Sequence, residues 1–333
     1  MHGQKLSVYQ TIRAVEWWEY KLSPIFATIY ATGFVLNVPV VSLWPVLVLA
    51  FVALIPGAAY VSVINDLTDL KDDLASGKNN RLVGRSRLFI GLMLACCVLP
   101  GVLVAIYLRN DILLLTLYLA NWAAFSLYSL PPVRLKNRGL PGILADAAGA
   151  HMLPTLFVVT LVYRRTAIPI DQLWFASVAV WSICYGLRGI LWHQFSDLDN
   201  DEKARLRTFV LRHKVSTLHR LGTFVIFPAE LIAFAMMLWL AGSRISVGLL
   251  FFYVLLQWTR KKRWKTNLVV VTPKSQYLIV MQEYYEAFYP IAFLLSSSLR
   301  YPRDAFVLIL HLIIFPRRAA QTVKDVTKLI KQR

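Results

Sequence analysis

Long runs of apolar residues alternate with shorter polar segments along most of the chain. Many of these runs approach the roughly 20 residues that an α-helix needs to cross the hydrocarbon core of a bilayer. They do not show the short alternating segments that are typical of a membrane β-barrel. The pattern predicts helices near residues 21–38, 43–66, 88–107, 111–130, 140–162, 172–196, 219–241, 244–258 and 282–299. We therefore expect an all-α integral membrane protein with about nine transmembrane helices, in a single membrane domain over residues 1–333.

The composition agrees with a chain whose solvent is a bilayer. Hydrophobic residues make up 57% of the 333 residues and charged residues only 16%. A soluble domain of this size needs more charge to cover its surface. The N-terminal segment is polar and lacks the apolar core of a signal peptide, so the first spanning helix is expected to act as the insertion signal. The cysteines lie in apolar segments and are interpreted as small packing residues.

The formal net charge of +18 is unevenly distributed along the chain. Basic residues gather in the polar segments after every second predicted helix, whereas the intervening segments carry few of them. This asymmetry is typical of cytoplasmic loops in membrane proteins. We therefore place segment 1–20, loops 66–87 and 197–218 and the basic tail 316–333 in the cytoplasm, in a multi-pass protein of the cell inner membrane. Because the charge follows topology, a nucleic-acid partner is disfavoured.

An acidic motif follows the second predicted helix. Asp66, Asp69 and Asp73 have the spacing i, i+3 and i+7, which places their carboxylates on one helical face. Three carboxylates held together repel one another unless a cation neutralises them. Mg²⁺ suits such a site because it binds through one or two carboxylates plus phosphate oxygens and waters. We interpret these residues as metal ligands; the structural alternative is a solvated acidic helix end.

A second acidic motif follows the sixth predicted helix, where Asp197 and Asp201 are spaced i, i+4. Both motifs lie at the cytoplasmic ends of helices in a chain with few acidic residues. We interpret them as two sides of one site for Mg²⁺ and a diphosphate. Neighbouring basic side chains could bind phosphate oxygens, or could act only as topology signals. They are Lys78, Arg81, Lys203 and Arg207.

A third motif spans residues 128–136 and contains a double proline that ends the fourth predicted helix. Arg134 and Lys136 then lie at the membrane surface. Asn121, which lies upstream, shares a stripe of the same helix with Tyr128. This stripe either packs against other helices or lines a path from the bilayer to the cytoplasmic loops.

Together the motifs resemble the signatures of the UbiA superfamily of intramembrane prenyltransferases. The stretches are Asn-Asp-x-x-Asp-x-x-x-Asp at 65–73, Tyr-Ser-x-Pro-Pro-x-Arg-x-Lys at 128–136 and Asp-x-x-x-Asp at 197–201. The resemblance implies a bundle around a central cavity that opens laterally to membrane lipid, with Mg²⁺ and an isoprenyl diphosphate at its cytoplasmic end. It implies that metal and diphosphate are held by Asn65, Asp66, Asp69, Asp73, Asp197 and Asp201, with Arg81, Lys136 and Lys203 as diphosphate contacts.

The resemblance also implies an activity: Mg²⁺-dependent transfer of a prenyl group to a lipid-soluble, aromatic acceptor after ionisation of the allylic diphosphate. No residue matches an aromatic-acceptor pocket. Intramolecular capture of the cation by a membrane terpene cyclase therefore stays open, as does phosphoribosyl transfer to a polyprenyl phosphate. A transporter is the non-enzyme alternative, although its ionisable residues would be expected at the midplane and not at helix ends.

Two features fall outside this interpretation. The apolar stretch 305–315 is short for a full crossing, which predicts either a tenth short span or a re-entrant element before the basic tail. Ionisable side chains within apolar helices are costly and should face a cavity or a partner. They are Asp146, His151, Arg188 and Glu230.

Overall fold

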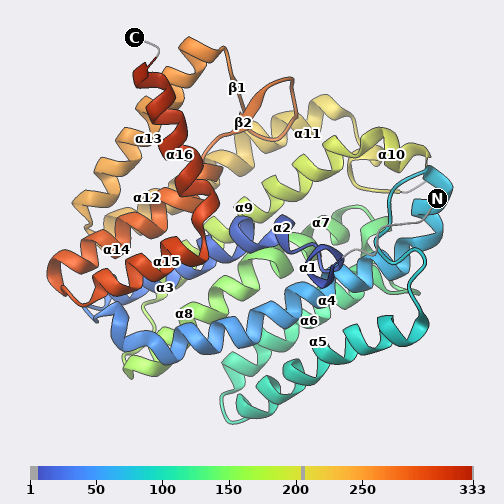
Figure 1. Ribbon diagram of the computed structural model, residues 1–333, viewed down its shortest axis with the longest axis horizontal. Coiled ribbons are helices and arrows are strands. Elements are labelled where there is room, and N and C mark those ends of the chain that lie inside the picture. Colours follow the sequence, from blue (N-terminus) through green and yellow to red (C-terminus); the bar gives the residue numbers. More distant parts are fainter. Residues whose placement is uncertain (1–6, 204–206, 332–333) are drawn as a thin grey trace.

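The computed structural model describes residues 7–203 and 207–331, and these form a bundle of helices (Figure 1). Continuous long helices are α4 (Trp44–Ser76), α5 (Arg87–Tyr107), α6 (Ile112–Ser129), α9 (Gln172–Ser196) and α13 (Arg244–Trp264). Two more helical segments contain a π-helical turn. They are α7, η4 and α8 (Leu140–Ala147, Ala148–Met152, Leu153–Thr166) and α11, η6 and α12 (Val215–Leu221, Gly222–Ile226, Phe227–Ala241). The predicted α-helical architecture is confirmed.

Shorter elements form the two chain ends and the connections. The N-terminal elements are α1 (Val8–Thr11), α2 (Ala14–Trp17), η1 (Trp18–Leu22) and α3 (Ser23–Val35). The connections contain η2 (Val40–Leu43), η3 (Leu135–Asn137), α10 (Leu198–Lys203) and η5 (Val210–Arg212). After α13 come β1 (Asn267–Val269), β2 (Tyr277–Ile279), η7 (Tyr284–Phe288), α14 (Tyr289–Arg300), α15 (Asp304–Ile314) and α16 (Pro316–Lys331).

Polar residues between the apolar runs determine where several long helices begin. The side chains of Ser86, Asp111 and Asp171 accept hydrogen bonds of 3.1, 3.1 and 2.9 Å from backbone N–H groups in the first turns of α5, α6 and α9. Such N-caps typically contribute about 1 kcal/mol. These three starts lie within a residue of the predicted positions, because the capping signal is local in sequence.

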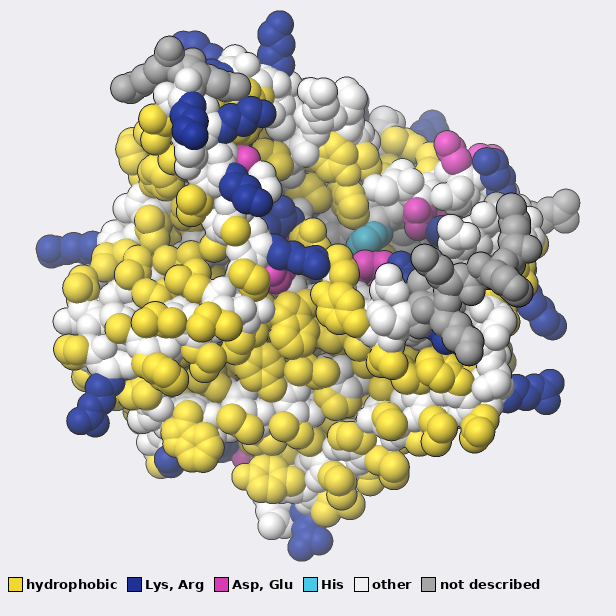
Figure 2. Space-filling view, in the orientation of Figure 1, with side chains coloured by type: hydrophobic (Ala, Val, Ile, Leu, Met, Phe, Trp, Pro, Cys, Tyr) yellow, Lys and Arg dark blue, Asp and Glu magenta, His cyan; other side chains and the backbone are white. Residues whose placement is uncertain are grey.

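Within the described residues, six helical segments are long and apolar enough to cross a membrane, or up to seven if α15 and α16 form one broken span. Figure 2 shows hydrophobic side chains covering most of one face of the molecule. The chain is therefore an integral membrane protein. The expected count of about nine spans is not confirmed: α3 and α14 have only 13 and 12 residues, and α13 is not among the six.

The short helix α3 lies inside the bundle. Every residue from Ser23 to Phe34 is buried, and the helix packs against α8, α12 and α14. A helix that is covered on all sides needs no polar face. Its sequence therefore resembles a membrane span, although its length is that of a core helix.

An ion pair explains two of the costly intramembrane residues. Arg188 on α9 and Glu230 on α12 are both almost fully buried, and the Arg188 Nε and Nη2 atoms each lie 2.8 Å from a Glu230 carboxylate oxygen. The guanidinium also lies over the Phe227 ring, 5.2 Å from its centroid. The pair therefore joins two of the long helices.

The C-terminal elements differ most from prediction. Strands β1 and β2 pair in parallel, with Asn267 opposite Tyr277, although no strand was expected. Helices α15 and α16 meet at an angle of 86°, so the stretch 305–315 belongs to a broken pair and not to a straight span. Backbone N–H groups of Arg317 and Arg318 donate to the Glu19 carboxylate at 2.9 and 3.0 Å. This N-terminal segment thereby caps α16, where a carboxylate is favoured.

Candidate active site

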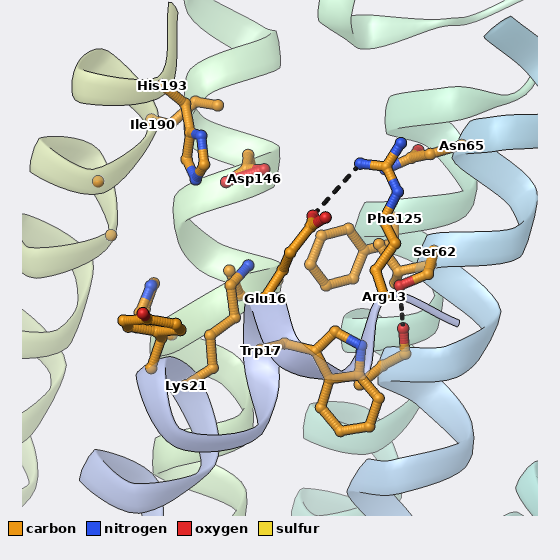
Figure 3. A pocket seen from close by; sticks show the side chains of 18 of the residues that line it. Arg13, Glu16, Trp17, Lys21, Ser62, Asn65, Phe125, Asp146, Ile190 and His193 are labelled. Carbon is orange, nitrogen blue, oxygen red and sulfur yellow. Dashed lines mark hydrogen bonds and ion pairs between the residues drawn. The ribbon is translucent and has the colours of Figure 1, made fainter. Parts of the chain in front are cut away.

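A cavity of about 960 Å³ is lined by residues of η1, α4, α6, α7, η4, α9, α10 and β2. In Figure 2 a hollow in the upper right exposes acidic side chains and a histidine. Figure 3 shows side chains from the N-terminal segment, α4, α6, α7 and α9 pointing into this cavity. Segments far apart in sequence therefore contribute to one site.

The first acidic motif lies on the last turns of α4, which continues well past the predicted helix end. The predicted loop 66–87 therefore begins as a helix. Asp69, Asp73 and Asn65 line the cavity. Asp66 has no exposed surface, and its carboxylate forms an ion pair with Arg13. The motif shares one helix, but Asp66 contacts the N-terminal segment instead of lining the cavity.

Basic side chains from the segment after α6 neutralise this motif. Arg134 Nη2 lies 2.9 Å from an oxygen of Asp69 and 2.7 Å from an oxygen of Asp72. Lys136 also forms an ion pair with Asp69. Burial lowers the pKa of Lys136, and the nearby Asp69 carboxylate opposes that shift. Of the two basic residues, Lys136 lines the cavity and Arg134 does not.

The second acidic motif reaches the same cavity from α9 and α10. Asp197 is the C-cap of α9, and the largely buried Asp201 lies in α10. Lys78, in the loop after α4, has its Nζ 3.0 Å from an Asp197 oxygen, so an ion pair links the loop that follows the first motif to the second motif. Lys203 and Arg207 are exposed and do not line the cavity. The structure thus brings both carboxylate motifs together, but not every basic residue beside them.

The third motif and the part of α6 before it contribute polar and aromatic side chains. Asn121 and Tyr128 on α6 line the cavity. Among the described residues, the buried Oδ1 of Asn121 has no hydrogen-bond partner. The neighbouring Trp122 ring lies 5.0 Å from that of Tyr60, and the Ser129 hydroxyl donates to Asn65. The cavity therefore combines a charged mouth with an aromatic wall.

The N-terminal segment supplies cavity residues that the sequence analysis did not propose. Glu16 accepts from Arg81 at 2.5 Å and lies 3.5 Å from Arg13, a contact drawn in Figure 3. Together with the pair between Arg13 and Asp66, these contacts hold the segment against the first motif. No sequence signal indicates these contacts, because charged residues in a terminal segment are usually interpreted as topology determinants.

Asn80 was also missed. Its Nδ2 donates to the backbone oxygen of Asp66 at 2.7 Å and to the Asp73 carboxylate at 2.8 Å. Its Oδ1 accepts from the Leu82 backbone N–H at 3.0 Å. This buried amide therefore folds the loop after α4 back onto the acidic motif. An uncharged residue in a basic loop gives no sequence signal for such a role.

The carboxylates fit a divalent cation that is bound jointly with a ligand. Within residues 7–203 and 207–331, no group of three His, Cys, Asp or Glu side chains is placed to hold a metal by itself. Mg²⁺ needs only one or two carboxylates where phosphate oxygens and waters complete its coordination. Carboxylates of both motifs, Asp69 and Asp73 from the first and Asp197 and Asp201 from the second, line this one cavity. The crowding of Asp197 and Asp201 would also be relieved by a cation.

Asp201 should make stability depend on pH. Burial, with the nearby charge of Asp197, raises its pKa from 3.8 to about 6. The fold thus favours the protonated carboxyl, and this favourable contribution is lost as the pH rises from about 4 through 6. Over that range the unmodified protein should lose about 2–3 kcal/mol of unfolding free energy, and Asp201→Asn should abolish this loss. Denaturant unfolding in detergent, without Mg²⁺, measures it.

The control for this prediction is Asp199→Asn, because Asp199 is exposed in the same motif. That variant should keep the pH dependence of the unmodified protein. Equal pH dependence for Asp201→Asn and the unmodified protein would contradict the prediction.

The fold and this cavity define a class: multi-pass membrane proteins whose candidate site joins two carboxylate motifs and a row of basic residues at helix ends. A family model described as the UbiA prenyltransferase family matches residues 25–271. The chain therefore belongs to the UbiA prenyltransferase family, whose members include prenyltransferases.

A solved structure shares this fold. A UbiA homolog from Archaeoglobus fulgidus bound to GPP and Mg²⁺ has 16% sequence identity and a TM-score of 0.56, over 91% of this chain and 99% of that one. A structure of a UbiA homolog from the same organism bound to DMAPP and Mg²⁺ has 15% identity and a TM-score of 0.47, over 97% and 99% of the two chains. The comparison with curated proteins gives no match.

Proposed function

We propose that this protein transfers a prenyl group from an isoprenyl diphosphate to a lipid-soluble acceptor within the membrane, with Mg²⁺ as its cofactor. The observation that carries the proposal is that carboxylates of both motifs line one cavity, together with Lys78, which forms an ion pair with Asp197. The homologous structure of similar fold is described as bound to GPP and Mg²⁺. The basic loops support a cytoplasmic position for the site, in a cell inner membrane.

The proposed chemistry is ionisation of the allylic diphosphate at the charged mouth. Mg²⁺ held by the carboxylates would neutralise charge on the departing pyrophosphate. Lys78, Arg81 and Lys136 line the same mouth, and their donors can bind phosphate oxygens. Their carboxylate partners keep these side chains in place before the ligand binds. The apolar helices around the cavity limit the access of water to the prenyl chain.

The aromatic wall gives a terpene cyclase as the second candidate. Tyr60, Trp122, Phe125, Tyr185 and Trp192 line the cavity below the carboxylates. Aromatic faces stabilise cations, so they could hold an allylic cation while its own chain captures it. The same wall would shield a cation that awaits an external acceptor. Phosphoribosyl transfer and transport share the acidic motifs but make no use of this wall.

The decisive measurement is pyrophosphate release by purified protein with Mg²⁺ and a panel of prenyl diphosphates. A transferase should release little pyrophosphate until an acceptor extract is added, and should then form a prenylated product. A cyclase should release pyrophosphate and a hydrocarbon without any acceptor. Failure to bind or turn over any prenyl diphosphate, with and without the extract, would overturn both readings.

A further inference from the structure

The cavity extends from its charged mouth deep into the bundle along α4. Its lining on this helix runs from Asp73 at the mouth to Leu54. Leu54 precedes Asn65 by eleven residues, which corresponds to about 16 Å along the helix axis. An extended isoprene unit spans about 5 Å at usual carbon–carbon bond lengths. The distance from Asn65 to Leu54 therefore matches a chain of about three units.

Apolar and aromatic side chains bound the inner end of the cavity. They are Ile25 on α3, Leu54 on α4, Trp122 on α6 and Pro154 on α8. Ile25 and Leu54 belong to the main hydrophobic core, so they can move only together with the helices that pack behind them. Trp122 is only partly buried. What lies behind its indole therefore decides whether the cavity can extend further.

Trp122 fills the space between the cavity and the outer helix α5. On one side its ring lies 5.0 Å from the ring of Tyr60, which also lines the cavity. On the other side, a Cβ atom added to Gly101 of α5 would lie only 2.5 Å from the indole. Gly101 is buried but is not part of the cavity lining in the described structure. The indole therefore lies in a recess that exists because residue 101 has no side chain.

Helix α5 lies at the edge of the bundle, beside α4 and α6 (Figure 1). Its buried residues are Cys97, Gly101 and Val104, whereas more than half of its residues are exposed. The Trp122 indole is thus the side chain between the cavity and a helix that faces lipid. Without the indole, a longer chain would extend beneath α5 towards the bilayer.

We propose that Trp122 limits the prenyl chain of the diphosphate substrate to about three isoprene units. A further unit has to displace the indole, and the backbone of α5 at Gly101 blocks its retreat. Forcing extra carbon atoms into such a packed wall is unfavourable. This inference rests on the proposed function and narrows its donor to a short-chain prenyl diphosphate, of farnesyl length or shorter.

Calorimetric titration of the purified protein in detergent with Mg²⁺ tests the chain length without an acceptor. The ligands are the S-thiolodiphosphates of geranyl, farnesyl and geranylgeranyl chains, in which sulfur replaces the bridging oxygen and slows ionisation. The geranylgeranyl analogue should bind about tenfold or more weakly than the farnesyl analogue. Additional apolar atoms by themselves favour burial, so weaker binding reports a steric limit. Trp122→Ala should bring the two affinities within about threefold, because it opens the space next to α5.

Gly101→Ala tests the same wall from outside the cavity. The new methyl group pushes the indole towards the cavity, so the farnesyl analogue should lose about tenfold in affinity while the geranyl analogue stays within about threefold. Gly91→Ala is the matched control on α5, because a Cβ atom there meets no described atom within 4 Å. Trp239→Ala is the control for Trp122→Ala, because Trp239 is 72% exposed and lies outside the cavity lining. Both controls should keep the affinities of the unmodified protein.

The inference and the proposed function fail in different ways. Equal or tighter binding of the geranylgeranyl analogue by the unmodified protein overturns the inference and leaves the proposed function intact. Unchanged preferences in both Trp122→Ala and Gly101→Ala also overturn it, and Gly101→Ala decides alone if Trp122→Ala does not fold. If none of the three analogues binds, the proposed function fails, and the inference fails with it.

Discussion

Replacing Asp197 with Asn should lower the rate of pyrophosphate release by about 10²–10³-fold at saturating prenyl diphosphate. Asp197 lines the cavity and accepts from Lys78 at 3.0 Å, so it holds the second motif to the loop after α4. The neutral amide cannot balance the lysine charge, and it is a weaker ligand for Mg²⁺. A coupled pyrophosphate assay with purified protein in detergent measures the rate.

Asp199→Asn is the matched control. It removes the same charge two residues further along the chain, from a side chain that is exposed and does not line the cavity. Its rate should stay within about twofold of the unmodified protein, since a surface charge contributes little. An equal loss of rate in both variants would mean that the rate depends on the net charge of the loop. It would contradict a specific role of Asp197 as a ligand for Mg²⁺. Similar thermal unfolding of the two variants confirms that folding is intact.

The second large effect concerns stability. Both side chains of the Arg188–Glu230 pair are at most 2% exposed. Glu230→Gln therefore leaves the guanidinium of Arg188 buried without its counter-ion. Removal of one partner from a buried ion pair typically costs about 3–5 kcal/mol. We expect a loss of that size in the free energy of unfolding, measured by titration with a denaturing detergent in mixed micelles.

The double variant Arg188→Met with Glu230→Leu separates the ion pair from the packing it supports. Because both charges are then absent, its loss should be smaller than that of Glu230→Gln alone. A Glu230→Gln protein as stable as the unmodified one would show that the guanidinium finds another partner, for which the Val270 carbonyl at 3.4 Å is the nearest candidate.

Most helices could be located from sequence because their signals are local. The apolar runs and the caps at Ser86, Asp111 and Asp171 define the starts of α5, α6 and α9. The count of spans could not be read in the same way. Apolar sequence does not distinguish a buried core helix such as α3 from a helix in contact with lipid, because both bury apolar side chains.

The strands and the C-terminal bend could not be predicted from the local pattern of apolar and polar residues. The pairing of β1 with β2 depends on backbone contacts across the loop between them. The capping of α16 by Glu19 joins residues about 300 positions apart. No window of sequence contains both partners of such a contact.

The sequence by itself determined the membrane setting, the family resemblance and the residue types of the site. Carboxylates at i, i+3, i+7 and at i, i+4 share a helical face because the periodicity of a helix is fixed by its backbone. Only the tertiary structure decided which of them meet. It buries Asp66 against Arg13, joins Asp197 to Lys78 and leaves Lys203 in solvent. These contacts could not be read from the sequence, because pairing depends on distances through space that a linear pattern does not encode.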